Sequence, residues 1–134
     1  MKTADFVQKD GYSCAACVLR YASYRLFGKN MSRESYVRLT GCRPDGVTMT
    51  KLRRVFEKTG FRAKGISLAA SRISRSLQAG RLVAIDDFEK GHVVLVYGKN
   101  KSVLNIFDSK AKSGTRRRKI ERVLKDAAEA FEVW

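Results

Sequence analysis

The spacing of apolar residues changes at Gly60, and this change is the strongest constraint on the fold. Before Gly60, apolar side chains recur every three or four residues, as on one face of an α-helix. After it, short apolar runs are separated by turn-forming groups, as in β-strands. Helices first and strands later are typical of the α+β class. Since the chain has 134 residues, 44% of them hydrophobic, we expect a single domain over residues 1–134 with a buried core.

Three helices are predicted in the first part of the chain. The first covers Cys14–Phe27 and ends at Gly28, which can adopt the left-handed conformation of a helix cap. The second starts after Ser32, whose hydroxyl can cap it, and the third covers Thr50–Thr59. The first of these predictions puts Cys14 in the first turn of a helix.

The second part is predicted to contain strands interrupted by helices. The expected order is a strand, a helix, a strand, a hairpin of two strands, a helix and a last strand at the sheet edge: Phe61–Ser67, Ser71–Gln78, Leu82–Asp86, His92–Tyr97 with Ser102–Phe107, Ile120–Ala128 and Phe131–Trp134. The group Gly98-Lys99-Asn100-Lys101 is interpreted as the hairpin turn, so its two strands should be antiparallel.

Four residues together predict nucleophilic catalysis. A thiol at a helix start, as expected for Cys14, feels the positive end of the helix dipole, which favours the thiolate. His92, the only histidine, opens a strand and can activate that thiol. Asp108 follows the neighbouring hairpin strand, where it can hydrogen-bond to His92 and fix its tautomer. Gln8, six residues before Cys14, can form an oxyanion hole with the backbone N–H of Cys14.

The order of these residues resembles that of the papain-like peptidases that cut double-glycine leaders from bacteriocin precursors. That family has a glutamine six residues before the cysteine of an Asp-Cys-Gly-x-x-Cys-Leu type segment, matched here by Gln8 and by Ser13-Cys14-Ala15-Ala16-Cys17-Val18-Leu19. Its histidine strand is matched by His92-Val93-Val94-Leu95-Val96, and its Asp-Pro pair by Asp108-Ser109. A glycine, a central leucine and a Gly-Phe pair are matched by Gly46, Leu52 and Gly60-Phe61.

The chain departs from the family pattern at three positions without losing a triad residue. Ser13 stands where the family often has Asp, Ala15 where it has Gly, and Ser109 where it has Pro. The resemblance implies a papain-like fold with N-terminal helices packed on an antiparallel sheet. It also implies a cysteine peptidase without a metal or organic cofactor, acting on a peptide or leader, with a Gly-Gly pair as the implied cleavage site. Many members are fused to a transporter, whereas Trp134 ends this chain where the peptidase domain would end, which is the expectation for a free-standing version.

The net charge of +15 supports a second hypothesis, in which the chain binds nucleic acid or another polyanion without catalysis. The cations predicted to take part form two groups in the sequence: Lys51, Arg53 and Arg54, and Lys110, Lys112, Arg116, Arg117, Arg118 and Lys119. An acidic peptide substrate would be attracted by the same charges. Charge alone therefore does not separate a peptidase from a polyanion-binding protein.

The cysteines and the scaffold leave further hypotheses open. A redox or zinc role for Cys14-x-x-Cys17 is less favoured, because Cys42 and His92 are isolated and no second ligand pair is present. A papain-like scaffold that serves only as an interaction module, or a thioester passed to an acceptor other than water, stays open. Three cysteines are too few for a disulfide scaffold, which favours the reducing cytoplasm. Neither a membrane span nor a signal peptide is predicted.

Overall fold

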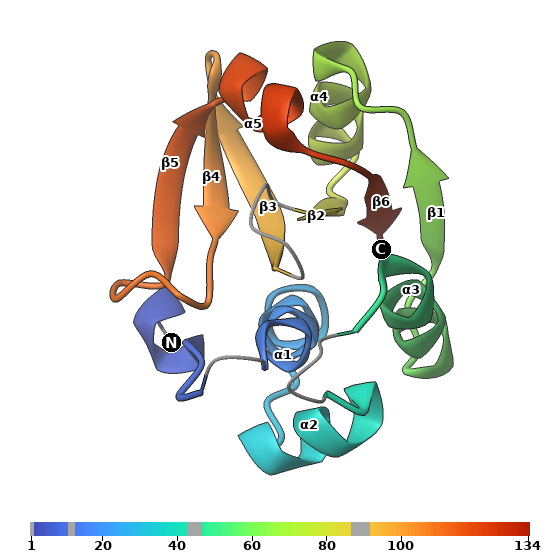
Figure 1. Cartoon of the computed structure of the whole chain (residues 1–134). Helices are drawn as coiled ribbons and strands as arrows, with labels where there is room; N and C mark the ends of the chain where they lie inside the picture. Colours follow the sequence, from blue (N-terminus) through green and yellow to red (C-terminus); the bar gives the residue numbers. More distant parts are fainter. Residues whose placement is uncertain (1, 11–12, 43–46, 87–91) are drawn as a thin grey trace.

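The computed structural model describes residues 2–10, 13–42, 47–86 and 92–134 (Figure 1). The predicted α+β order is confirmed by the helices and strands found there. These are a 3-10 helix, η1 (Thr3–Phe6), then α1 (Cys14–Phe27), α2 (Arg33–Thr40), α3 (Met49–Lys58), β1 (Ala63–Ile66), α4 (Ala70–Gln78), β2 (Leu82–Asp86), β3 (Val93–Asn100), β4 (Val103–Phe107), β5 (Thr115–Lys119), α5 (Ile120–Asp126) and β6 (Ala130–Val133). Gly46, one position of the family resemblance, lies outside the described residues.

Local signals for the N-terminal helices are confirmed. The helix α1 has the predicted limits, and Gly28 caps it with φ +68°. The side chain of Ser32 accepts a hydrogen bond from the backbone N–H of Ser35, as expected of a cap at the start of α2. The end of α1 and the start of α2 are therefore fixed by short-range features of the sequence.

The six strands form one antiparallel sheet in the order β1-β6-β2-β3-β4-β5. Figure 1 shows β1 and β5 at the two edges. The predicted edge position of the last strand is wrong, because β6 lies between β1 and β2. All four residues of β6 are buried, which suits a strand that is paired on both sides.

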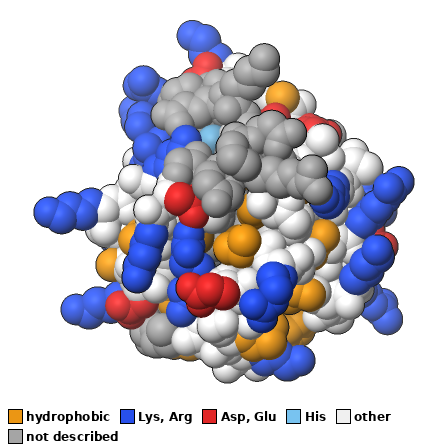
Figure 2. All heavy atoms as spheres, turned by 60° about the horizontal axis from the view of Figure 1, so that its bottom comes forward, with side chains coloured by type: hydrophobic (Ala, Val, Ile, Leu, Met, Phe, Trp, Pro, Cys, Tyr) orange, Lys and Arg blue, Asp and Glu red, His pale blue; other side chains and the backbone are white. Residues whose placement is uncertain are grey.

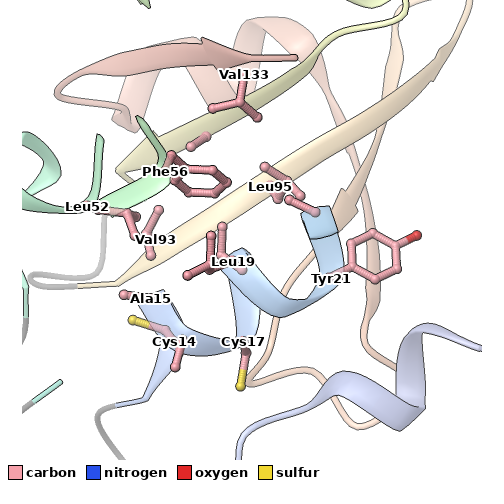
Figure 3. Close-up of a cluster of buried hydrophobic side chains, with 14 of the residues drawn as sticks. Cys14, Ala15, Cys17, Leu19, Tyr21, Leu52, Phe56, Val93, Leu95 and Val133 are labelled. Carbon is pink, nitrogen blue, oxygen red and sulfur yellow. The ribbon is translucent and has the colours of Figure 1, made fainter. Parts of the chain in front are cut away.

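The two faces of the sheet bury two separate apolar clusters. Successive residues of β3 alternate between them: Val93 and Leu95 pack with α1, α2 and α3, whereas Val94 and Val96 pack with α4 and α5. Figure 3 shows the first cluster, where α1 lies against β3. Because both faces are covered, the start of β3 is apolar without a polar alternation.

The hairpin turn differs from the prediction. Gly98, Lys99 and Asn100 are part of β3 and pair with β4, and the chain turns at Lys101, whose φ is +57°. The register shifts between Val96 and Gly98. Backbone pairing therefore continues past the apolar run. The residues that extend the strand have no apolar side chains, so the apolar pattern of the sequence did not predict them as part of it.

The strand β5 was not predicted, because its sequence Thr-Arg-Arg-Arg-Lys carries no apolar residue. It pairs with β4 along its whole length and forms one edge of the sheet. The turn before it packs on η1 so closely that a Cβ at Gly114, where φ is +75°, would lie 2.4 Å from the carbonyl oxygen of Thr3. No described helix is long and apolar enough to cross a membrane.

Candidate active site

Cys14 is the first residue of α1 and is held in place by the residues before it. The backbone N–H of Ser13 donates to Oδ1 of Asp10 over 2.8 Å, and Arg33 at the start of α2 forms an ion pair with the same carboxylate. Ser13 is fully buried and Cys14 is 5% exposed. Figure 3 shows the sulfur of Cys14 and that of Cys17 pointing in different directions from α1.

His92 and Asp108 meet where β3 begins and β4 ends. Nε2 of His92 lies 2.8 Å from Oδ1 of Asp108, and the two side chains are 2% and 0% exposed. Oδ1 also accepts a hydrogen bond from the backbone N–H of Lys110 over 3.0 Å. The hydrogen bond expected between the histidine and the aspartate is therefore present, and it leaves Nδ1 as the ring nitrogen available to a thiol.

The electrostatics of Cys14 and His92 favour an ion pair. Burial raises the pKa of the Cys14 thiol, but its hydrogen bonds with His92 and with the backbone of Val93, together with the charge of His92, outweigh burial and lower that pKa below its ordinary value. Burial opposes protonation of His92, but its hydrogen bonds with Asp108 and Cys14 raise its pKa to about 9. The lowered pKa of the thiol and the raised pKa of the histidine both favour the thiolate–imidazolium pair over the neutral pair.

The other two cysteines lack this environment. Burial raises the pKa of Cys17 to about 11, and burial also raises the pKa of Cys42. All three thiols are free. Within the described parts of the chain, no three His, Cys, Asp or Glu side chains gather closely enough to hold a metal ion. Among the three thiols, only that of Cys14 has a lowered pKa.

Gln8 lies beside the loop that follows Asp108. Its backbone N–H donates to the carbonyl oxygen of Ser109 over 3.0 Å, and Oε1 of its amide accepts from the hydroxyl of Ser109. Nε2 donates to the carbonyl oxygen of Asp10 over 2.6 Å. Ser109, which replaces the family's proline, thus supplies a side-chain hydrogen bond to Gln8 that proline lacks. The amide of Gln8 keeps a second N–H, the group that an oxyanion hole requires.

Two residues near the site have roles that the sequence did not predict. Arg116 in β5 forms an ion pair with Asp108, with 2.9 Å between Nη2 and Oδ2, whereas the sequence placed it only among the possible polyanion-binding cations. Asp10 holds the start of α1. A carboxylate three residues before the N-cap residue, here Ser13, is a recognisable turn signal. The Arg116 contact, in contrast, depends on the strand β5, which the sequence pattern did not predict.

The candidate polyanion-binding residues do not form one surface. Lys51, Arg53 and Arg54 lie on α3, which packs near β1 and β6, whereas the other group lies on β5 and on the loop before it, at the opposite edge of the sheet (Figure 1). Figure 2 likewise shows lysine and arginine side chains spread around the face that it presents. The positive charge is thus distributed rather than gathered into a single binding surface.

Comparison with known proteins gives the family. The profile of the Peptidase C39 family matches residues 4–126. The chain belongs to the Peptidase C39 family. As a member it is a cysteine-type peptidase, with Cys14, His92 and Asp108 brought together at one end of the sheet. No curated protein sequence is significantly similar to it.

Solved structures of C39 peptidase domains share the fold. The peptidase domain of Streptococcus ComA, a bifunctional ABC transporter involved in quorum sensing, is 19% identical with a TM-score of 0.74, and the alignment covers 96% of this chain and 93% of that one. A double glycine motif protease from an AMS/PCAT transporter, solved with its leader peptide, is 17% identical with a TM-score of 0.70 over 94% and 86% of the two chains.

A third structure, the peptidase C39 like domain of a toxin secretion ATP-binding protein from Vibrio parahaemolyticus, is 20% identical with a TM-score of 0.65 over 94% and 96%. At these identities the likeness establishes the papain-like fold. The fold expected from the sequence is therefore confirmed.

Proposed function

We propose that this C39 peptidase hydrolyses a peptide bond with a triad of Cys14, His92 and Asp108. The observation that carries the proposal is the contact of the three side chains, in which His92 bonds Asp108 through Nε2 and lowers the pKa of the Cys14 thiol. Two of the three side chains, those of His92 and Asp108, are buried and hold each other by a hydrogen bond. The arrangement favours a thiolate before substrate arrives, as a cysteine nucleophile requires.

The first half of the reaction forms a thioester. The Cys14 thiolate attacks the carbonyl carbon of the peptide bond, and the carbonyl oxygen becomes an oxyanion. The backbone N–H of Cys14 and the second N–H of the Gln8 amide stabilise that charge. The imidazolium of His92 then gives its proton to the amide nitrogen, the C–N bond breaks, and the amine product leaves.

The second half releases the acid. His92, now neutral, takes a proton from a water molecule, whose oxygen attacks the thioester carbonyl. The C–S bond breaks, the Cys14 thiolate and the His92 imidazolium are restored, and a carboxylic acid leaves. Asp108 keeps Nε2 of His92 engaged throughout, so that Nδ1 faces the reacting atoms.

The proposed substrate is a leader peptide cut after a Gly-Gly pair. Support comes from the family and from the double glycine motif protease solved with a leader peptide. A groove of about 400 Å³ runs between Val7–Asp10 and Ser109–Lys112, next to Gln8. Lys9, Lys110 and Lys112 line it, which supports acidic residues in the bound peptide.

We also propose that residues 1–134 act as one domain in the cytoplasm. One sheet joins the N-terminal and C-terminal halves, since β1 pairs with β6. The three free thiols support a reducing compartment.

The experiment that tests the triad is alkylation of the thiols across pH, with mass mapping of each cysteine. We expect Cys14 to react at pH values where Cys17 and Cys42 do not, since its pKa is lowered and theirs are raised. Cleavage of a Gly-Gly peptide should reach a plateau below the pKa of His92 and fall as pH rises through about 9, where the imidazolium loses its proton.

The matched variants are His92→Ala and Cys42→Ser. His92→Ala should remove both the early labelling of Cys14 and the cleavage, whereas Cys42→Ser should leave both unchanged. Labelling of Cys14 that is as slow as that of Cys42 in the wild type, and indifferent to His92→Ala, would overturn the proposed triad.

A further inference from the structure

Arg116 reaches the candidate site from an edge strand that carries four consecutive cations. Its backbone lies directly opposite Ile106 in β4. Its side chain shares with Val94 and Ile106 the small pocket between the sheet and α5. Arg117, next in the chain, is opposite Asn105 and is exposed. The alternation of a strand thus sends one arginine toward Asp108 and the next one away.

The adjacent strands β3, β4 and β5 bring His92, Asp108 and Arg116 close together. His92 lies two residues before Val94 of β3, and Asp108 lies two residues after Ile106 of β4. Each stands one position outside its strand, and the contacts of Asp108 with His92 and with Arg116 bring the three side chains together at this end of the sheet. This meeting depends on the register of β3, β4 and β5.

The two oxygens of Asp108 are engaged by different partners. Oδ1 lies 2.8 Å from Nε2 of His92 and accepts from the backbone N–H of Lys110, while Oδ2 lies 2.9 Å from Nη2 of Arg116. Asp108 is 0% exposed, whereas the side chain of Arg116 is 28% exposed. The contact of Arg116 with Oδ2 is an ion pair and does not have hydrogen-bond geometry. A buried carboxylate that is hydrogen-bonded on one oxygen and ion-paired on the other is held in one orientation, and removing either partner weakens that hold.

We propose that Arg116 is a positioning residue that fixes the carboxylate of Asp108 toward His92 and limits the pH at which the imidazolium persists. The inference rests on the triad proposed above. Arg116 touches neither Cys14 nor a substrate atom in this scheme, so it acts through Asp108 and is not itself a catalytic residue.

The sign of the pH effect follows from the charges that face each group. His92 faces Asp108 and the Cys14 thiol; Asp108 faces His92, Arg116 and the backbone of Lys110. Burial raises the pKa of Asp108, but its hydrogen bonds with His92 and Lys110 and the charge of Arg116 lower it. A cation on Asp108 also opposes a second positive charge on His92, so its removal should raise the pH at which His92 loses its proton.

The test compares Arg116→Gln with Arg117→Gln, which removes the same charge from the neighbouring position. Rates of Gly-Gly peptide cleavage are measured from pH 5 to 10. We expect Arg116→Gln to lower kcat/KM about tenfold, through kcat with little change in KM, as misplacement of a catalytic group does. The basic limb of its pH profile should move to higher pH. Arg117→Gln should keep the wild-type rate and profile, and Arg116→Lys should keep the wild-type limb.

Arg116→Met is the second variant, because its side chain can pack against Val94 and Ile106 if the glutamine variant does not fold. An Arg116 variant that is folded by thermal denaturation and matches Arg117→Gln in both kcat and pH profile would overturn the inference. That outcome differs from failure of the triad, in which the wild type itself would show no cleavage dependent on His92.

Discussion

Two buried carboxylates, Asp108 and Glu132, lie in the same sheet and differ in what they contact. Both are 0% exposed, and burial raises the pKa of each while hydrogen bonds outweigh burial and hold it below its ordinary value. Asp108 binds a histidine and an arginine. Glu132 binds two arginines and a serine: Arg72 over 2.9 Å, Arg81 over 2.7 Å and Ser76 over 2.7 Å.

The difference shows that a buried acid with a lowered pKa does not by itself mark a catalytic group. The partners of Glu132 keep their charge state throughout the physiological range, so they can only tie β6 to α4 and to the segment before β2. One partner of Asp108, His92, gains and loses a proton at about pH 9. A carboxylate that controls such a proton can serve chemistry, whereas one whose partners are only arginines and a serine serves stability.

The largest expected effect is on activity. Asp108→Asn should lower kcat by about 10³- to 10⁴-fold, because the amide favours the wrong tautomer of His92. Glu132→Gln, an equally small change at the other carboxylate, should leave kcat within a factor of about two of the wild type. Steady-state cleavage of a Gly-Gly peptide by both variants measures the contrast. Similar losses in the two variants would contradict the distinction between the two carboxylates.

The second effect is on stability. Glu132→Ala should lower the free energy of unfolding by about 3–5 kcal/mol, because Arg72 and Arg81 lose the carboxylate that both of them pair with. The folded-state pKa of Glu132 is depressed, so its contribution is present above the unfolded value of 4.5 and is lost as pH falls through the folded-state value.

Urea denaturation at pH 7 and at pH 3 tests this effect. The difference between wild type and Glu132→Ala should be large at pH 7 and smaller at pH 3. The variant that still folds should keep the wild-type pH profile of cleavage. A shifted basic limb of the pH profile would show that Glu132, too, affects the protonation of His92.

The smallest effect concerns surface charges near each carboxylate. The double variant Lys110→Glu with Lys112→Glu should lower kcat/KM for an acidic peptide about two- to tenfold, and less at high salt, because exposed charges act through screened attraction. The double variant Lys64→Glu with Lys58→Glu, which reverses two exposed lysines of β1 and α3, is the matched control and should have no such effect. Equal changes from both would assign the effect to total charge alone.

Local structure could be predicted where short-range chemistry decides it. The limits of α1 and β2 and the caps at Gly28 and Ser32 follow from residues within a few positions of each other. The strand β5 and the inner position of β6 could not be predicted. A strand of arginines has no apolar pattern, and the place of a strand in a sheet depends on partners far away in the sequence.

The sequence by itself determined which residues can do the chemistry: one histidine, a cysteine at a helix start and an aspartate after a strand, in an order that resembles a peptidase family. Only the tertiary structure decided that His92 and Asp108 touch, that the pKa of the Cys14 thiol is lowered while that of Cys17 is raised, and that Arg116 forms an ion pair with Asp108. The physical reason is that thiol and carboxyl pKa values depend on burial and on charges a few ångströms away, and these neighbours come from strands and helices that only folding brings together.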